Sequence, residues 1–242
     1  MSNRVLLVED DSSIARFVGI ALEELPIELV VCASVATALD ALRAQPVRLV
    51  ITDLMLPGES GLSLLQALQD QPALRCEALL VVFSAGVTTD VRQQLNDLQV
   101  WRIMSKPASV AELEACVRDA LQLNVVAERL PGGTEVDLTA EERLAITTHF
   151  AGDAVLFRAY RYSCFAQFSA DRQAGDQAMA AQDAPALRRL AHSLATVLLT
   201  LGYQEASVVA RALETTAQTD DLPGMAEGWQ RLKIWLVARP SS

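Results

Sequence analysis

Histidine, lysine and cysteine are scarce in this 242-residue sequence, which has two histidines, two lysines and four cysteines. The cysteines are scattered without CxxC or metal-ligand spacing, which predicts small core residues in a reducing compartment and argues against disulfides or a metal centre. No apolar run approaches the roughly 20 residues that a bilayer-spanning helix needs. The formal net charge of −10 argues against a nucleic-acid surface, because phosphate binding requires clustered Lys and Arg. We therefore expect a cytoplasmic protein that binds neither membrane nor nucleic acid.

Short, almost wholly apolar runs alternate with amphipathic segments through residues 1–123, the predicted first domain. Such runs are typical of strands buried on both faces of a parallel sheet. The predicted strands lie at 5–8, 27–31, 47–51, 78–83 and 100–104. The predicted helices lie near 12–24, 35–44, 61–69, 88–98 and 109–122. Five strand–helix alternations predict an α/β fold, a doubly wound five-stranded parallel sheet, with any site at the carboxyl ends of the strands.

A Pro-Gly-Gly break within residues 124–138, the predicted linker, separates this domain from a wholly helical second half. Helical periodicity in that half predicts helices at 139–149, 153–173, 174–181, 184–201, 203–218 and 222–238. Asp183 followed by Pro185 is a typical helix start. Amphipathic helices joined by short loops predict an all-α antiparallel helical bundle over residues 139–240.

Polar side chains stand at the carboxyl ends of four of the five predicted strands. They are Glu9, Asp10 and Asp11 after the first strand, Asp53 after the third, Ser84 at the end of the fourth, and Lys106 after the fifth. The ends of parallel strands are neighbours, so these groups are expected to form one cluster. Clustered carboxylates repel one another unless a cation holds them, and oxygen-only ligands favour Mg²⁺. The sequence therefore predicts a Mg²⁺ site that includes Asp53.

The same cluster is suited to phosphoryl transfer onto a carboxylate. A metal ion and a Lys neutralise the equatorial oxygens while Asp53 attacks in line, and the Ser84 hydroxyl can hydrogen-bond the bound group. Basic residues in this chain are almost all Arg, so the choice of Lys at 106 indicates that a compact point charge is needed there. Taken singly, an Asp after a strand is more often a helix cap or a turn residue, and a helix cap is the alternative role for Asp11.

The first half resembles the receiver domains of two-component response regulators over residues 3–122. The motifs that carry the resemblance are VEDD at 8–11, TDLMLPGESG at 52–61, SA at 84–85 and KP at 106–107. The resemblance implies that Asp53 is the phosphorylation site. The metal ligands that it implies are Glu9, Asp10, Asp53 and the carbonyl of Met55. One position departs from the family, since Ile103 stands three residues before Lys106, where Tyr or Phe is frequent. This departure implies an altered hydroxyl-and-aromatic switch, with phosphate acceptance retained.

Of the two histidines, His149 is expected to be structural or exposed, whereas His192 has informative surroundings. The apolar residues of 184–201 form one stripe, and at about 100° per residue His192 lies roughly 160° from its centre. Its side chain is therefore expected to face away from the bundle core, either as a solvated residue or as a phosphate carrier. Arg188 and Arg189 precede it by four and three residues, so both can approach the ring. Two such cations favour the neutral, nucleophilic imidazole and attract a phosphoryl group.

Residues 149–238 resemble a histidine-containing phosphotransfer (Hpt) domain. The family signature reads roughly AHxLKG followed by LG, and the chain carries AHSL at 191–194 and LG at 201–202. The resemblance implies that His192 is phosphorylated. Ala195 and Thr196 replace the family's Lys and Gly, which removes a charge near the phosphohistidine and adds bulk. Arg188 and Arg189 are candidates to replace that charge, from the other side of the ring along the helix axis.

Two functions are compatible with these features. In the first, the chain is a phosphorelay intermediate and not an enzyme: a sensor or hybrid histidine kinase phosphorylates Asp53, and His192 exchanges phosphoryl groups with a receiver domain, in cis or in a partner. In the second, phosphorylation of Asp53 controls docking, and the bundle captures a partner without carrying phosphate. The outward orientation expected for His192 favours the first, and the residues at 195 and 196 favour the second. A hydrolytic enzyme is disfavoured, because no nucleophile–base pair or transition-metal spacing is present.

Overall fold

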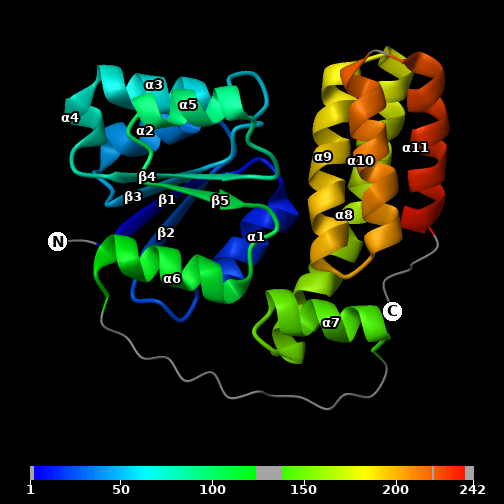
Figure 1. Cartoon of the computed structure of the whole chain (residues 1–242), viewed down its shortest axis with the longest axis horizontal. Helices are drawn as coiled ribbons and strands as arrows, with labels where there is room; N and C mark the ends of the chain where they lie inside the picture. Colours follow the sequence, from blue (N-terminus) through cyan, green and yellow to red (C-terminus); the bar gives the residue numbers. More distant parts are fainter. Residues whose placement is uncertain (1–2, 124–137, 220, 238–242) are drawn as a thin grey trace. The chain divides into compact units, whose positions relative to one another are not determined.

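The computed structural model describes residues 3–123, 138–219 and 221–237, and the chain divides into two compact units, Met1–Arg129 and Leu130–Ser242 (Figure 1). The predicted linker at 124–138 falls almost entirely outside the described residues. The domain limits of 1–123 and 139–240 therefore stay predictions. Within the described ranges, no helix is both long and apolar enough to cross a membrane.

The first unit contains a five-stranded parallel sheet with the order β2-β1-β3-β4-β5. Its strands are β1 Arg4–Val8, β2 Glu28–Cys32, β3 Leu49–Thr52, β4 Leu79–Ser84 and β5 Arg102–Ser105. The register sets Val8 beside Thr52, and Thr52 beside Val82, so the carboxyl ends of the central strands are close to level. The predicted doubly wound parallel sheet is confirmed, and each predicted strand overlaps an observed one.

Burial on both faces holds for the central strands and fails at the edges of the sheet. β1 and β3 are buried along their whole length, whereas only Cys32 is buried in β2. Val31 of β2 is 49% exposed. β2 and β5 are the outer strands, each with one neighbour, so part of their surface has nothing to pack against. An apolar run alone therefore does not distinguish a central strand from an edge strand.

Helices cover both faces of the sheet. Those described in this unit are α1 Ser12–Ala21, α2 Val35–Ala44, α3 Gly61–Asp70, α4 Pro72–Arg75, α5 Thr89–Asp97 and α6 Val110–Leu121. α2, α3 and α5 lie on one face, and α1 and α6 on the other (Figure 1). Asp11 caps α1 as expected, since its carboxylate accepts from the N–H groups of Ser13 and Ile14, both at 2.8 Å. The single turn of α4 was not predicted, because four residues carry no helical periodicity.

Three of the four cysteines, Cys32, Cys116 and Cys164, are buried as predicted. Cys76 is exposed, and the prediction of a core position for it is wrong. It directly follows α4 and adopts a φ of 52°, in the left-handed region. Cys76 lies in a turn at the surface before β4, so its side chain does not reach the core.

The described part of the second unit is helical. Its helices are α7 Ala140–His149, α8 Ala154–Ala181, α9 Ala184–Thr200, α10 Gln204–Gln218 and α11 Leu222–Val237. α8 to α11 lie side by side as a bundle (Figure 1). Asp183 caps α9 by accepting from the Ala186 N–H at 2.9 Å, and Pro185 lies in the first turn, as predicted. The predicted all-α bundle is confirmed.

Glu142 connects α7 to the bundle. Its carboxylate accepts hydrogen bonds from the Thr139 N–H at 2.9 Å, from Arg161 of α8 at 2.8 Å and from the Tyr203 hydroxyl at 2.9 Å. Burial alone would raise the pKa of Glu142, but these three donors lower it below its ordinary value. A buried carboxylate with three donors is well satisfied, so α7 is attached to the helices that follow.

The predicted helix break between residues 173 and 174 is wrong, because α8 runs uninterrupted for 28 residues. Gly175 is a weak helix former within this stretch. The ring of Trp229 from α11 occupies the space beside it, and the Trp229 Nε1–H donates to Asp176 at 3.0 Å. Packing between α8 and α11 therefore offsets the low helix propensity of Gly175.

Replacing Gly175 with Ala is expected to destabilise the bundle by about 1–3 kcal/mol through overpacking. An added Cβ would lie 2.1 Å from the Trp229 ring, so the indole or the helix must move. Urea denaturation of the full chain measures the change. Gln177→Ala, at an exposed position of the same helix, is the control. An unchanged transition midpoint for Gly175→Ala would contradict this account of the contact.

Candidate functional site

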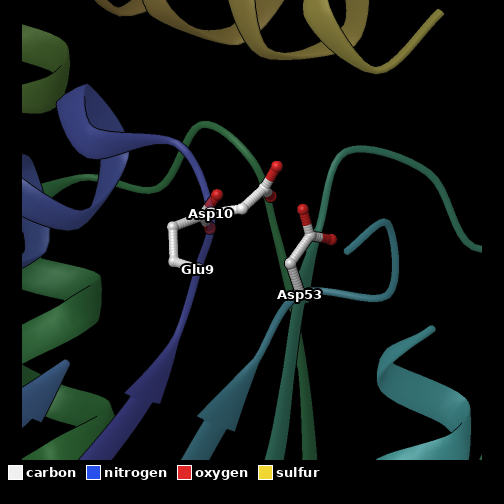
Figure 2. Close-up of side chains that lie close together, drawn as sticks. All are labelled: Glu9, Asp10 and Asp53. Carbon is white, nitrogen blue, oxygen red and sulfur yellow. The ribbon is translucent and has the colours of Figure 1, made fainter. Parts of the chain in front are cut away.

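The ends of β1 and β3 bring three carboxylates together (Figure 2). Glu9 and Asp10 follow β1, and Asp53 follows β3. One carboxylate oxygen from each residue lies within 4.8 Å of the others. Glu9 and Asp53 are buried, and Asp10 is half-buried. The predicted acidic cluster therefore forms, and its oxygen donors fit a hard divalent cation.

Lys106 reaches the cluster from the end of β5. Its Nζ lies 2.5 Å from Glu9 Oε2 and 2.7 Å from Asp53 Oδ2, and its side chain is fully buried. The ammonium also lies 5.2 Å from the centroid of the Phe83 ring. A single ammonium thus donates to two carboxylates, which agrees with the choice of Lys at this position.

Burial governs the acid strength of the cluster. It raises the pKa of Glu9 to about 8, although Lys106 opposes the shift, and repulsion from Asp53 adds to it. Burial also raises the pKa of Asp10. Burial would lower the pKa of Lys106, but Glu9 and Asp53 more than offset this and raise it. Three carboxylates lie near one ammonium, which bonds to only two of them, so a second cation would stabilise their ionised forms.

Backbone groups orient Asp53. Its Oδ1 accepts from the N–H groups of Leu54 at 2.6 Å and Met55 at 3.2 Å, while Oδ2 receives the Lys106 bond. The Thr52 hydroxyl donates to the Asp53 carbonyl at 2.8 Å. Met55 therefore meets the site through its N–H, and the metal-binding role of its carbonyl stays a prediction.

Ser84 and Ile103 lie on the strands beside the cluster. Ser84 ends β4, is 3% exposed and is paired in register with Ser105 of β5. Ile103 on β5 is half-buried and packs against the apolar core between the sheet and α2, α3 and α5. An aliphatic side chain thus occupies the position where the receiver family often has an aromatic one.

Gly61, the first residue of α3, leaves room for the Asp53 backbone. A Cβ at this position would lie 1.9 Å from the Asp53 carbonyl oxygen. We therefore expect Gly61→Ala to displace the Asp53 segment and destabilise the first unit by about 1–3 kcal/mol, as measured by thermal denaturation. The matched control is Gly19→Ala in α1, where an added Cβ meets nothing within 4 Å and is expected to stabilise by about 0.5–1 kcal/mol. Equal effects of the two substitutions would contradict the prediction.

The expectation that His192 is exposed and faces away from the bundle core is wrong. The residue is 7% exposed, and its Nδ1 lies 2.9 Å from Glu214 Oε1 on α10. α9 packs against both α8 and α10, so a side chain outside the centre of the apolar stripe still meets a neighbouring helix. Among the described residues, the other ring nitrogen, Nε2, has no hydrogen-bond partner.

Glu214 was not anticipated as a partner of His192. Burial would raise the pKa of Glu214, but the interactions with His192, Arg188 and Arg211 lower it below its ordinary value. An ionised carboxylate only accepts, so His192 Nδ1 is the donor of this hydrogen bond. The pairing of Glu214 with His192 could have been predicted from sequence spacing. The two residues lie at similar sequence distances from the short loop 201–203 that joins α9 and α10. Arg188 and Arg189, the predicted neighbours of the ring, are half-buried on α9.

The parallel sheet with an acidic triad and a buried Lys at its carboxyl edge defines a phosphoryl-accepting signalling module, here followed by a helical bundle. Residues 5–118 match the Response regulator receiver domain family, and residues 163–238 match the Hpt domain family. The chain therefore belongs to the two-component signalling proteins, as a receiver domain followed by an Hpt domain. Both domains are phosphotransfer modules, and neither is an enzyme in the ordinary sense.

The matching relatives TorS and PfeR are longer than this chain. The sensor protein TorS of Escherichia coli K12 is 27% identical over 237 residues, which is 96% of this chain and 24% of TorS. The transcriptional activator protein PfeR of Pseudomonas aeruginosa is 31% identical over 134 residues, which is 54% of this chain and 41% of PfeR. The solved signal receiver domain of an HD domain-containing protein from Pseudomonas fluorescens Pf-5 is 26% identical, with a TM-score of 0.46 over 50% of this chain and 88% of that chain. This chain thus spans less than half the length of TorS or PfeR.

Proposed function

We propose that this chain is a phosphorelay intermediate with two phosphoryl-carrying residues, Asp53 and His192. A sensor or hybrid histidine kinase is the expected donor to Asp53, and His192 exchanges phosphoryl groups with a receiver domain, in cis or in a partner. The observation that best supports the proposal is the buried Lys106, bonded to both Glu9 and Asp53 at the carboxyl edge of the sheet. The groups expected to hold Mg²⁺ are the carboxylates of Glu9, Asp10 and Asp53 and the carbonyl of Met55.

At Asp53, a carboxylate oxygen attacks the phosphorus of a donor phosphohistidine. The new P–O bond forms as the P–N bond breaks, and the donor imidazole leaves with the electron pair. Lys106 neutralises charge on the phosphoryl oxygens, the Ser84 hydroxyl donates to one of them, and the Leu54 N–H keeps the carboxylate oriented. When bound, Mg²⁺ supplies further neutralisation of the phosphoryl oxygens.

At His192, Nε2 is the nucleophile, because the Nδ1–H is engaged in a hydrogen bond that Glu214 accepts. Nε2 forms the P–N bond while the acyl P–O bond of the donor aspartyl phosphate breaks, and the donor carboxylate leaves with the electron pair. No proton is displaced from Nε2, and the ring gains positive charge. Glu214 stabilises that charge and holds the ring in one orientation.

The alternative is a phosphorylation-controlled binding module whose bundle carries no phosphate. The burial of His192 favours this function, since a phosphoryl donor must reach Nε2. Ala195 and Thr196, which replace the family's Lys and Gly and are 1% and 3% exposed, also favour the binding module. In this case the His192–Glu214 pair only stabilises the contact between α9 and α10.

The stability of the covalent label separates the two functions. The full chain and its His192→Gln variant are incubated with a phosphorylated partner receiver domain. A phosphohistidine is acid-labile and base-stable, whereas an acyl phosphate is base-labile. Acid-labile, base-stable label on the parent that is lost in His192→Gln would establish transfer. His149→Gln is the matched control and should keep the label. Absence of phosphohistidine with several competent donors would favour the binding module.

A further inference from the structure

The Lys that the Hpt family carries three residues after its histidine is Ala195 here, so any phosphoryl group on His192 needs positive charge from another residue. Position 195 lies where α9 and α10 are in contact. The Ala195 carbonyl accepts a hydrogen bond from the Ser207 hydroxyl of α10 at 2.8 Å. The neighbouring helix α10 therefore lies beside position 195 and can supply a replacement.

Two contacts define how α9 and α10 are aligned, namely His192 with Glu214 and Ala195 with Ser207. Residue numbers rise along α9 as they fall along α10, so the two helices are antiparallel. Arg211 lies three residues from Glu214 toward the connecting loop, as Ala195 lies three residues from His192 toward the same loop. Both displacements are about 4.5 Å along the helix axis. The His192–Glu214 contact sets Arg211 level with position 195, and the Ala195–Ser207 contact sets it about one turn nearer the start of α9, at position 191. Arg211 is therefore level with the turn of α9 that holds His192 and the position where the family has Lys.

We propose that Arg211 binds the phosphoryl group carried by His192 and replaces the Lys missing at position 195. Arg188, one turn before His192 on α9, acts from the opposite side of the ring. This inference rests on the proposed function of His192. Residues three or four apart on a helix share a face, so Arg211 lies on the face of Glu214 and Arg188 on that of His192.

The charges and unpaired groups around the histidine support this assignment. Both arginines lie close enough to Glu214 to lower its pKa. Arg188 Nε and His192 Nε2 have no hydrogen-bond partner in the part of the chain that the structure describes. Glu214 offsets one of the two guanidinium charges, which leaves one for the dianionic phosphoryl group. A planar guanidinium donates two parallel hydrogen bonds to phosphoryl oxygens, so Arg suits this role.

The test uses the full chain carrying Asp53→Asn, so that label accumulates only on histidine. Phosphoramidate is the probe, and the phosphohistidine is followed by ³¹P NMR, with the labelling rate measured against phosphoramidate concentration. Arg211→Gln is expected to slow labelling by about 10- to 100-fold, the loss for one charge-assisted hydrogen bond. Arg211→Lys is expected to retain most of the rate. Arg231→Gln, which removes an exposed charge from α11, is the control and should match the parent.

Circular dichroism and thermal melting verify that each variant folds. Slow labelling of folded Arg211→Gln, with recovery in Arg211→Lys, supports the inference. Labelling of His192 at the parent rate in Arg211→Gln, or equal slowing in Arg231→Gln, would overturn it and leave the proposed function standing. If the parent yields no phosphohistidine with either phosphoramidate or a phosphorylated receiver domain, the proposed function fails, and this inference fails with it.

Discussion

Replacing Asp53 with Asn is expected to abolish phosphorylation of the receiver domain, with a loss of at least about 100-fold. A neutral amide oxygen is a far weaker nucleophile than the carboxylate that Lys106 and two backbone N–H groups hold in position. Acetyl phosphate with Mg²⁺ is a suitable donor, and intact-protein mass spectrometry measures the added phosphoryl group. Chelation of the metal with EDTA should also suppress labelling of the parent.

Asp11→Asn is the matched control for this substitution. Asp11 belongs to the same run of acidic residues, but its carboxylate caps α1, and Asn caps a helix about as well as Asp. The control should therefore take up label at close to the parent rate. Labelling of the Asp53→Asn receiver domain at the parent rate, or loss of labelling in Asp11→Asn, would contradict the assignment of Asp53 as the acceptor.

Replacing Lys106 with Met is expected to destabilise the receiver domain by about 3–5 kcal/mol at high pH, because it leaves two buried carboxylates without their ammonium. The penalty should depend on pH. The pKa of Glu9 is about 8 in the folded protein, well above its ordinary value of about 4.3. Between these values the folded state binds the proton that the unfolded state has lost, so stability falls as pH rises. Without Lys106 the pKa of Glu9 rises further, and the loss continues above pH 8.

Urea denaturation at pH 6 and at pH 9 measures this effect. The Lys106→Met variant should lose more stability relative to the parent at pH 9 than at pH 6. Lys233→Met is the control, since Lys233 pairs with Asp176 in a solvent-exposed bridge, and exposed ion pairs contribute little to stability. The same loss at both pH values would show that repulsion between buried carboxylates is not the cause.

The sheet and the acidic cluster were predictable from the sequence because both depend on local patterns. Short apolar runs separated by amphipathic segments specify parallel strands, and the carboxyl ends of such strands meet at one edge. Glu9, Asp53 and Lys106 each directly follow a strand, so their proximity follows from the topology alone. The edge position of β2 was not predictable in this way, because strand order depends on which neighbours pair.

The environment of His192 depended on packing between helices, which periodicity within one helix does not describe. The apolar stripe of α9 was identified correctly, but the face beyond it meets α10 through Glu214. The same reason explains the error at Gly175, where Trp229, more than 50 residues later, keeps α8 continuous. Within the bundle, the residues that were misplaced are therefore those whose surroundings come from another helix.

The exposed thiol of Cys76 gives this chain a ready position for a spectroscopic probe. The other three cysteines are buried, so a maleimide dye or a nitroxide spin label should react at this one position without further mutagenesis. Cys76 precedes β4 and therefore lies at the amino-terminal edge of the sheet, whereas Asp53 lies at the carboxyl-terminal edge. A probe attached there can follow the receiver domain during phosphorylation without occupying the acceptor site.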